Sequence, residues 1–172
     1  AELLLDKRLG VDDDEIPKEV AAVARTLTLS ALWNLDGIRN GSVLRFLGDA
    51  NLMQEGKILR GADMYRVDLT RANLLGANLG KSYLRHADLS SADLRIANVK
   101  HADLANTVLH KANLSNAHLF FAHLENANLS GARLKEAMLS EANLYGANLK
   151  GAFLNKAYLR NANLETADLR NA

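Results

Sequence analysis

The stretch Ala142–Gly151 reads ANLYGANLKG, which is two copies of a five-residue unit. In each unit alanine, a polar residue and leucine are followed by two variable residues. The same register runs without a slip from Met64 to Leu169 and gives 22 consecutive units. The third position is leucine in 20 of them, and the first position is alanine in 19. Such regularity indicates a repeat architecture, in which each unit buries its apolar residues against its neighbours.

The period of five argues against an α-helix and favours an extended backbone. In a helix, successive units would be rotated by about 140°, so the leucines would face every direction instead of forming a stripe. In an extended chain, residues two apart point the same way. The first and third positions then face inward, the second faces outward, and the fourth and fifth can turn the chain. Glycines suit such a bend at the fifth position (Gly76, Gly131, Gly146, Gly151) and at the fourth (Gly80).

The unit resembles the Ala-(Asp/Asn)-Leu-x-x consensus of the pentapeptide-repeat family, as in Ala72-Asn73-Leu74. The resemblance covers about two thirds of the chain. It implies a mainly β fold, a right-handed quadrilateral β-helix with four units per coil, and hence about 5.5 coils. At a strand spacing of about 4.8 Å, the stack would be roughly 26 Å tall. The third-position leucines form the expected core, represented by Leu74, Leu89, Leu94, Leu114, Leu134 and Leu154.

The first 60 residues lie outside this register. We expect an N-terminal α-helical leader or cap over 1–56 and the repeat β-helix over 57–172. Pro17 stands where a helix prefers its first residue. Apolar residues at three- and four-residue spacing then predict a helix from about 17 to 34. Ser42 can cap a second helix, and residues 2–9 can form a short helical stub. The spaced apolar residues are Val20, Val23, Leu27 and Ala31.

An unprotected solenoid end exposes apolar surface and open strand edges, so helices ahead of the first coil are a natural cap. Trp33 is expected in the core of this cap, and Lys57-Ile58-Leu59 as a degenerate first unit. The leader also resembles a segment that precedes the repeats in some cyanobacterial-type members, which can carry membrane-spanning helices upstream. That resemblance implies that the chain can be the soluble part of a larger, membrane-tethered protein. It rests on Ala24–Thr28, Leu35–Gly37 and Ser42–Leu47.

The sequence carries no common enzyme motif, and we expect no catalytic, cofactor-binding or metal site. There is no cysteine, so a thiolate metal site is excluded. Of the five histidines, His118 and His123 occupy outward positions of successive units and should diverge around a corner, whereas a metal needs converging ligands. Asp68 and Asp88 are expected to be neighbours in one column, and a carboxylate pair could do acid/base work. The favoured interpretation is that such aspartates accept hydrogen bonds from the turn backbone.

Charge separates the two binding functions that we consider. Some pentapeptide-repeat proteins resemble duplex DNA in shape and charge and bind DNA gyrase in its place, which needs a strongly acidic surface. Residues 61–172 instead hold 13 Lys or Arg and 10 Asp or Glu. Direct nucleic-acid binding is not expected either, because the basic residues are dispersed among acidic ones. We therefore favour a structural or protein-interaction module, with the DNA-mimic regulator of gyrase as the alternative.

A candidate partner surface follows from the stacking, because outward residues 20 apart should form columns. Large apolar or aromatic residues occupy positions that are elsewhere mostly polar, and exposed groups of this kind often mark an interaction site. The alternative is that these side chains only stack on one another and stabilise the coils. The candidate residues are His118, Phe120, Phe121, Met138, Phe153 and Tyr158.

The identity of the protein partner is not encoded in any motif. Ala172 is where another unit would begin, and no charged finish follows it, so we expect end-to-end stacking into a homo-oligomer or a continuing parent chain. No apolar run approaches the roughly 20 residues of a membrane span, so we expect no direct membrane insertion by this chain. A cytoplasmic location is expected.

Overall fold

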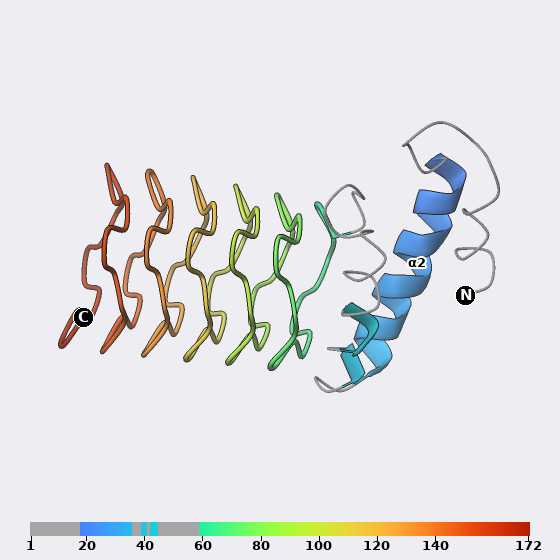
Figure 1. The fold of residues 1–172 in the computed structure, drawn as a ribbon, viewed down its shortest axis with the longest axis horizontal. Helices are drawn as coiled ribbons and strands as arrows, with labels where there is room; N and C mark the ends of the chain where they lie inside the picture. The colour runs from blue at the N-terminus through green and yellow to red at the C-terminus, as the bar shows by residue number, and fades with distance from the viewer. Residues whose placement is uncertain (1–17, 36–38, 41, 45–58) are drawn as a thin grey trace.

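The computed structural model describes residues 18–35, 39–40, 42–44 and 59–172. The side chain of Trp33, which we expected in the core of the cap, lies outside the described part of the chain. The repeats form a stack of similar coils, and helix α2 (Lys18–Asn34) lies across the N-terminal end of the stack (Figure 1). The predicted helix from about 17 to 34 is therefore confirmed. Residues 39–40 and 42–44 are also helical. The predicted stub over 2–9 and the boundary at 56/57 lie outside the described residues.

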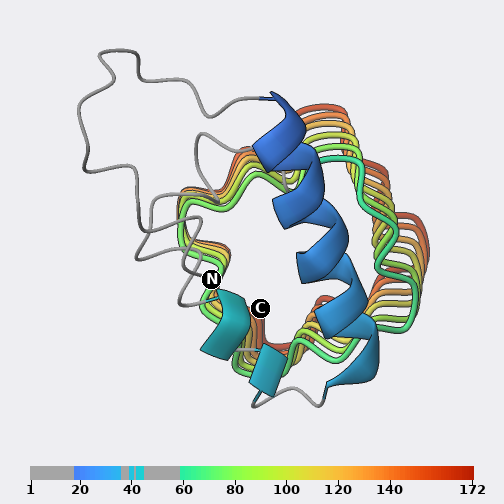
Figure 2. The same cartoon turned by 90° about the vertical axis from the view of Figure 1, so that its right-hand side faces the viewer.

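Parallel pairing sets the register of the coils. Each of the 18 bridges among the described residues joins two second-position residues that are 20 apart, from Asp63–Tyr83 to Asn148–Asp168. One coil therefore contains four units, as predicted, and seen along its axis it has four sides (Figure 2). We number the faces by their first second-position residue: face 1 starts at Asp63, face 2 at Asp68, face 3 at Asn73 and face 4 at Asn78. Each face continues in steps of 20 residues.

Backbone hydrogen bonds connect every inner coil to both neighbours. The second-position N–H donates to the first-position C=O of the preceding coil, as from Arg133 to Ala112 (2.9 Å). The third-position N–H donates to the second-position C=O of the following coil, as from Leu134 to Phe153 (2.8 Å). The fifth-position N–H donates to the fourth-position C=O of that same following coil. Pairing is thus limited to one residue per face, and the chain turns between faces.

Each corner is a tight turn closed by the N–H of the next first position. In the unit at Leu144, for example, the N–H of Ala147 donates to the C=O of Leu144 (3.0 Å). All 22 fifth positions have a left-handed φ between 56° and 66°, which is the arrangement of a type II turn. Only four of them are glycine, so 18 other residues adopt this conformation, and those ahead of the last coil are held there by the ladder bonds. Gly80, at a fourth position, lies in the turn as predicted but does not have a left-handed φ.

The core is a column of alanine and leucine side chains inside the stack. Leu74, Leu89, Leu94, Leu114 and Leu134 are 1% exposed or less. Leu154, which was expected in the same core, is only partly buried. Its coil packs against the preceding coil on one side and has no coil on the other. The remaining third-position leucines of that last coil are partly buried or exposed: Leu159, Leu164 and Leu169.

At the other end of the stack, α2 and residue 44 contribute apolar side chains to the core. Leu32 and Leu44 are buried in the same cluster as Met64 and Leu69 of the first coil. Leu59 is buried as well, and its C=O closes the turn to Ala62 (3.1 Å), so it acts as the third position of the degenerate unit that we predicted.

Two side chains of the leader bond to carbonyl groups at this end. Asn40, which is fully buried, donates from Nδ2 to the C=O of Asp68 (2.7 Å) and lies 3.1 Å from the C=O groups of Leu32 and Leu35. Arg25 donates to the C=O of Arg60 (2.8 Å). The corresponding carbonyls one coil later, in Asp88 and Gly80, accept from third- and fifth-position N–H groups. The leader therefore supplies donors where a preceding coil would have supplied them.

The packed face of α2 differs from the predicted one. Val23 and Leu27 are 60% and 64% exposed, whereas Thr28 and Leu32 are buried. The inward face runs through residues 25, 28, 29 and 32, which have the same helical spacing. Leucine and threonine alternate around this part of the helix, so spacing alone did not distinguish the two faces.

Candidate interaction surfaces

The outward second position has a structural task in most units. All 14 units with Asn or Asp at this position show the same bond, in which the side-chain Oδ1 accepts from the backbone N–H two residues later. At Asp88, for example, Oδ1 lies 2.8 Å from the N–H of Ser90. The favoured interpretation of these aspartates as turn acceptors is confirmed, and it accounts for the Asp/Asn of the repeat.

Eight second positions lack this bond because another residue type replaces Asn or Asp. Five of the eight lie on faces 3 and 4, in the coils that span residues 113–158. On each of these two faces the replacements are consecutive along one column. The eight replacements are Tyr83 and His123 on face 1, Val108 on face 2, Arg133 and Phe153 on face 3, and His118, Met138 and Tyr158 on face 4.

Face 4 carries the continuous column that the spacing predicted. His118 pairs with Met138, and Met138 pairs with Tyr158, so the three residues occupy one column in consecutive coils. His118 and Tyr158 are exposed, and Met138 is partly buried. Phe120 lies at the fourth position of the same face and is partly buried. We call these four residues the face 4 column.

The other two candidates lie apart from this column. Phe121, at the corner that follows face 4, stacks on His101 one coil earlier, with ring centroids 5.0 Å apart and planes 6° apart. Phe153 lies on face 3 and pairs with Arg133. The corner between Phe153 and Tyr158 carries the ion pair of Lys156 with Glu136 (4.0 Å). The six candidates therefore divide into the face 4 column, Phe121 stacked at a corner, and Phe153 on face 3. The sequence did not indicate His101 as the partner of Phe121.

Face 3 has a groove of about 390 Å³ beside Phe153. Lys111, Gly131 and Arg133 line it together with Asn113. Elsewhere on this face, Arg95 donates to the carboxylate of Asp93 from Nε (2.8 Å) and from Nη2 (2.7 Å). This bidentate hydrogen bond lowers the pKa of Asp93. The sequence analysis did not predict the groove, because its five lining residues come from five different units.

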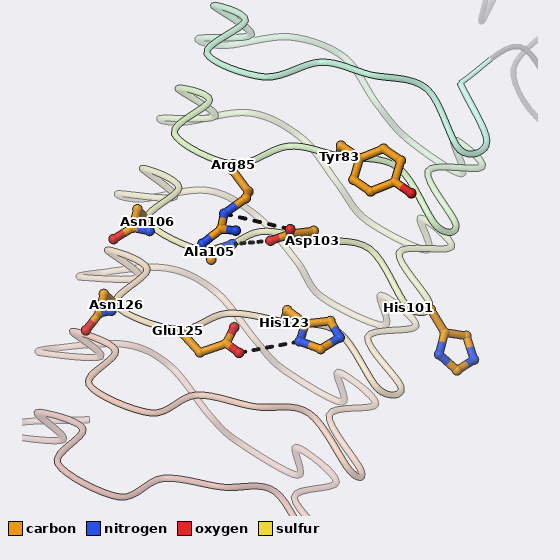
Figure 3. A pocket seen from close by; sticks show the side chains of 9 residues that line it. All are labelled: Tyr83, Arg85, His101, Asp103, Ala105, Asn106, His123, Glu125 and Asn126. Carbon is orange, nitrogen blue, oxygen red and sulfur yellow. Dashed lines mark hydrogen bonds and ion pairs between the residues drawn. The ribbon is translucent and has the colours of Figure 1, made fainter.

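A second groove, of about 350 Å³, lies on face 1 where Ala105 occupies a fourth position (Figure 3). Arg85 lies 3.8 Å from the carboxylate of Asp103, and His123 lies 3.4 Å from that of Glu125. Asn143 also donates to Glu125 (2.7 Å). The polar side chains here are thus largely paired with one another. Within the part of the chain that the structure describes, no group of three or more His, Asp or Glu side chains is placed to hold a metal ion.

The comparisons with known proteins agree with this geometry. The profile of the family described as "Pentapeptide repeats" matches with eight copies, over residues 58–85, 87–120, 117–155 and 137–172. This is more than half of the chain, and the chain belongs to the pentapeptide-repeat family. Members of this family fold as right-handed quadrilateral β-helices. A search of the curated proteins found no match.

Several solved structures are similar to this chain. HetL, a pentapeptide-repeat protein involved in heterocyst differentiation regulation in the cyanobacterium Nostoc sp. strain PCC 7120, is 36% identical over 64% of this chain and 56% of its own, with a TM-score of 0.42. Rfr23 from the cyanobacterium Cyanothece 51142 is 40% identical over 59% of this chain and 63% of its own, with a TM-score of 0.25. The chain thus spans less than two thirds of the length of both. Among the described residues, no helix is long and apolar enough to cross a membrane.

Proposed function

We propose that this chain is a non-enzymatic interaction module, and that the face 4 column is where it docks a protein partner. The observation that supports this most is the run of three replaced second positions, His118, Met138 and Tyr158. An Asn or Asp at each of them would add a hydrogen bond to the turn, of a kind that contributes about 0.5–1.5 kcal/mol. The stability of the turns alone gives no reason to replace them. Aromatic residues and methionine are enriched at the centres of protein interfaces.

The alternative role of the column is a side-chain ladder that stabilises the coils, and one variant separates the two. Replacing His118, Met138 and Tyr158 together by Asn restores the residue type that caps the turn at most second positions. If the column is a docking surface, the melting temperature should stay the same or rise, while capture of partners from an extract of the source organism is lost. Calorimetry and quantitative mass spectrometry of the captured proteins measure the two effects.

Tyr83 provides a matched control for this variant. It occupies the same repeat position on face 1 and is 58% exposed, compared with 57% for Tyr158. Tyr83→Asn should therefore leave the captured proteins unchanged. If the triple variant instead melts at a clearly lower temperature and still captures the same proteins, the column is structural and this proposal is wrong.

We also propose that the helical leader caps the first of about 5.5 coils. Its support is the burial of Leu32 and Leu44 against that coil and the bonds from Asn40 and Arg25 to its carbonyl groups. Without these contacts, Met64 and Leu69 would be exposed at the end of the stack.

At the other end we propose stacking of a second copy on the last coil. The leucines at this end are only partly buried, and the inner coils show that each coil accepts a neighbour through the same backbone pattern. Light scattering is expected to show a dimer at high concentration, and Leu159→Asp together with Leu164→Asp should return it to a monomer. A wild-type chain that is strictly monomeric at every concentration would contradict this.

The DNA-mimic alternative has little support in the distribution of charge. Such a mimic needs acidic residues along its whole surface. Here face 4 carries Lys100 and Arg160 and, apart from the glutamates at its corners, no carboxylate, and basic residues outnumber acidic ones on face 3. A regulator of gyrase that works by imitating DNA is therefore the weaker proposal.

A further inference from the structure

The small net charge of the repeats conceals a large difference between two opposite faces. Each face is counted here with the corner residues on both of its sides. Face 3 carries six basic residues and two acidic ones, whereas face 1 carries three basic and five acidic. The basic residues of face 3 are Arg71, Arg95, Lys111, Arg133, Lys135 and Lys156, and its acidic residues are Asp93 and Glu136. Because the four faces follow one another around the coil, faces 1 and 3 lie on opposite sides of it. The solenoid is therefore electrically polarised across its width.

Most of the positive charge on face 3 that has no ion-pair partner among the described residues lies at the face 3 groove, and the remainder is Arg71 in the first coil. Arg95 is bound by Asp93, and Lys135 and Lys156 both lie within 4.0 Å of Glu136. The side chains of Lys111 and Arg133 make no ion pair or hydrogen bond with any residue that the structure describes. Arg133 also occupies a second position, where it replaces an Asn or Asp that would have closed the turn. Two cations of face 3 therefore remain free in the same groove.

The shape of the groove comes from glycines at the corner before face 3. Gly131 and Gly151 follow Lys111 in that corner column, one coil and two coils later. A Cβ on Gly131 would lie 3.4 Å from Cγ of Lys111, and one on Gly151 would meet nothing within 4 Å. The absence of side chains there leaves one side of Phe153 open, and this ring is 57% exposed. Lys111, Arg133 and Phe153 thus border a single open groove.

We propose that the face 3 groove binds an acidic segment of a partner protein. Two carboxylates of the segment pair with Lys111 and Arg133, and an apolar side chain beside them packs on Phe153. Charge complementarity supplies both the orientation and the discrimination against other segments. The proposal shares with the proposed function only the idea that the chain docks a protein. It uses a different face, so either proposal can fail without the other.

A protein segment fits this groove better than a nucleic acid does. A nucleic-acid strand needs a track of cations that follows its phosphates. On face 3 such a track is interrupted, because Asp93 neutralises Arg95 and Glu136 lies between Lys135 and Lys156. Two free cations beside one ring match two carboxylates and one apolar side chain.

The test uses the whole chain and a fluorescein-labelled peptide of alternating Glu and Phe, with binding followed by fluorescence anisotropy. Lys111→Asn with Arg133→Asn removes both cations. Asn tolerates the left-handed φ of residue 111, and at position 133 it is the residue type that caps the turn, so the fold should be retained. Each exposed ion pair accounts for a factor of up to about five, so the affinity should fall roughly tenfold. Phe153→Asn should weaken binding as well.

The charge-matched control is Lys81→Asn with Lys150→Ser, which removes one corner cation and one fourth-position cation away from face 3. It should change the affinity less than about twofold, as should the triple Asn variant of the face 4 column. Equal losses in the two charge variants would show a general charge effect and overturn the proposal. The proposal would also be overturned if the peptide showed no saturable binding, or if an oligothymidine bound more tightly than the peptide. A dimer that light scattering detects in the wild-type chain and not in the Lys111→Asn, Arg133→Asn variant would overturn it too, because face 3 would then join two copies of the chain.

Discussion

Replacing Leu114 by alanine is expected to lower the free energy of unfolding by about 2–5 kcal/mol. Leu114 is 1% exposed and lies in the middle of the stack, with a coil on each side. The backbone N–H of Leu114 donates to the following coil and the backbone of Asn113 bonds to the preceding coil, so the surroundings cannot collapse easily into the cavity. A denaturant titration of the purified chain measures the change.

Ser115→Ala is the matched control, since it alters the adjacent residue on the outside of the same coil. The hydroxyl of Ser115 donates to Oδ1 of Asn113 (2.8 Å), but the backbone N–H of Ser115 already donates to the same oxygen. Its loss should cost under about 0.5 kcal/mol. Equal and small effects from both substitutions would mean that the third position does not face the core.

Deleting residues 1–56 is expected to cause aggregation, and it is the most damaging change that we predict. The deletion removes Leu32 and Leu44 from their contacts with the first coil, and it exposes Met64 and Leu69. It also removes the donors of Asn40 and Arg25, so the end of the sheet is opened to other chains. Size-exclusion chromatography with light scattering and a thermal melt measure the outcome. A truncated chain that stays monomeric with an unchanged melting profile would show that the leader is an independent appendage.

Asn40→Ala tests the same cap without removing any segment. The buried amide reaches three carbonyl oxygens, whereas its own Oδ1 has no partner among the described residues. The gain from removing that oxygen partly offsets the lost bonds, and we expect a net loss of about 1–3 kcal/mol. Asn34→Ala is the control, because it removes an exposed amide whose one bond among the described residues is to the C=O of Ser30 within α2 (2.7 Å). An equally small loss from both would count against a cap held by Asn40.

The repeat period predicted part of the candidate interaction surface, but not the contacts between its side chains. A period of 20 placed His118, Met138 and Tyr158 in one column, because stacking follows directly from four units per coil. The same arithmetic put Phe153 on a neighbouring face. It could not show that an ion pair at the corner separates Phe153 from Tyr158, or that Phe121 stacks on His101. Those contacts depend on the directions of side chains at the corners, which the period leaves open.

The amino-acid pattern alone determines the inward and outward positions and indicates the family, and the resemblance to that family implied four units in a coil. It does so because the solenoid is nearly one-dimensional: each unit meets only neighbours at fixed offsets in the sequence. The contacts between the leader and the first coil, and those between side chains of different coils, depend on the tertiary structure. In it, Leu32 and not Leu27 packs on the first coil, and the buried Asn40 bonds to the C=O of Asp68. The tertiary structure also gathered Lys111 and Arg133 on one face, since residues 22 apart become neighbours only when the coils close.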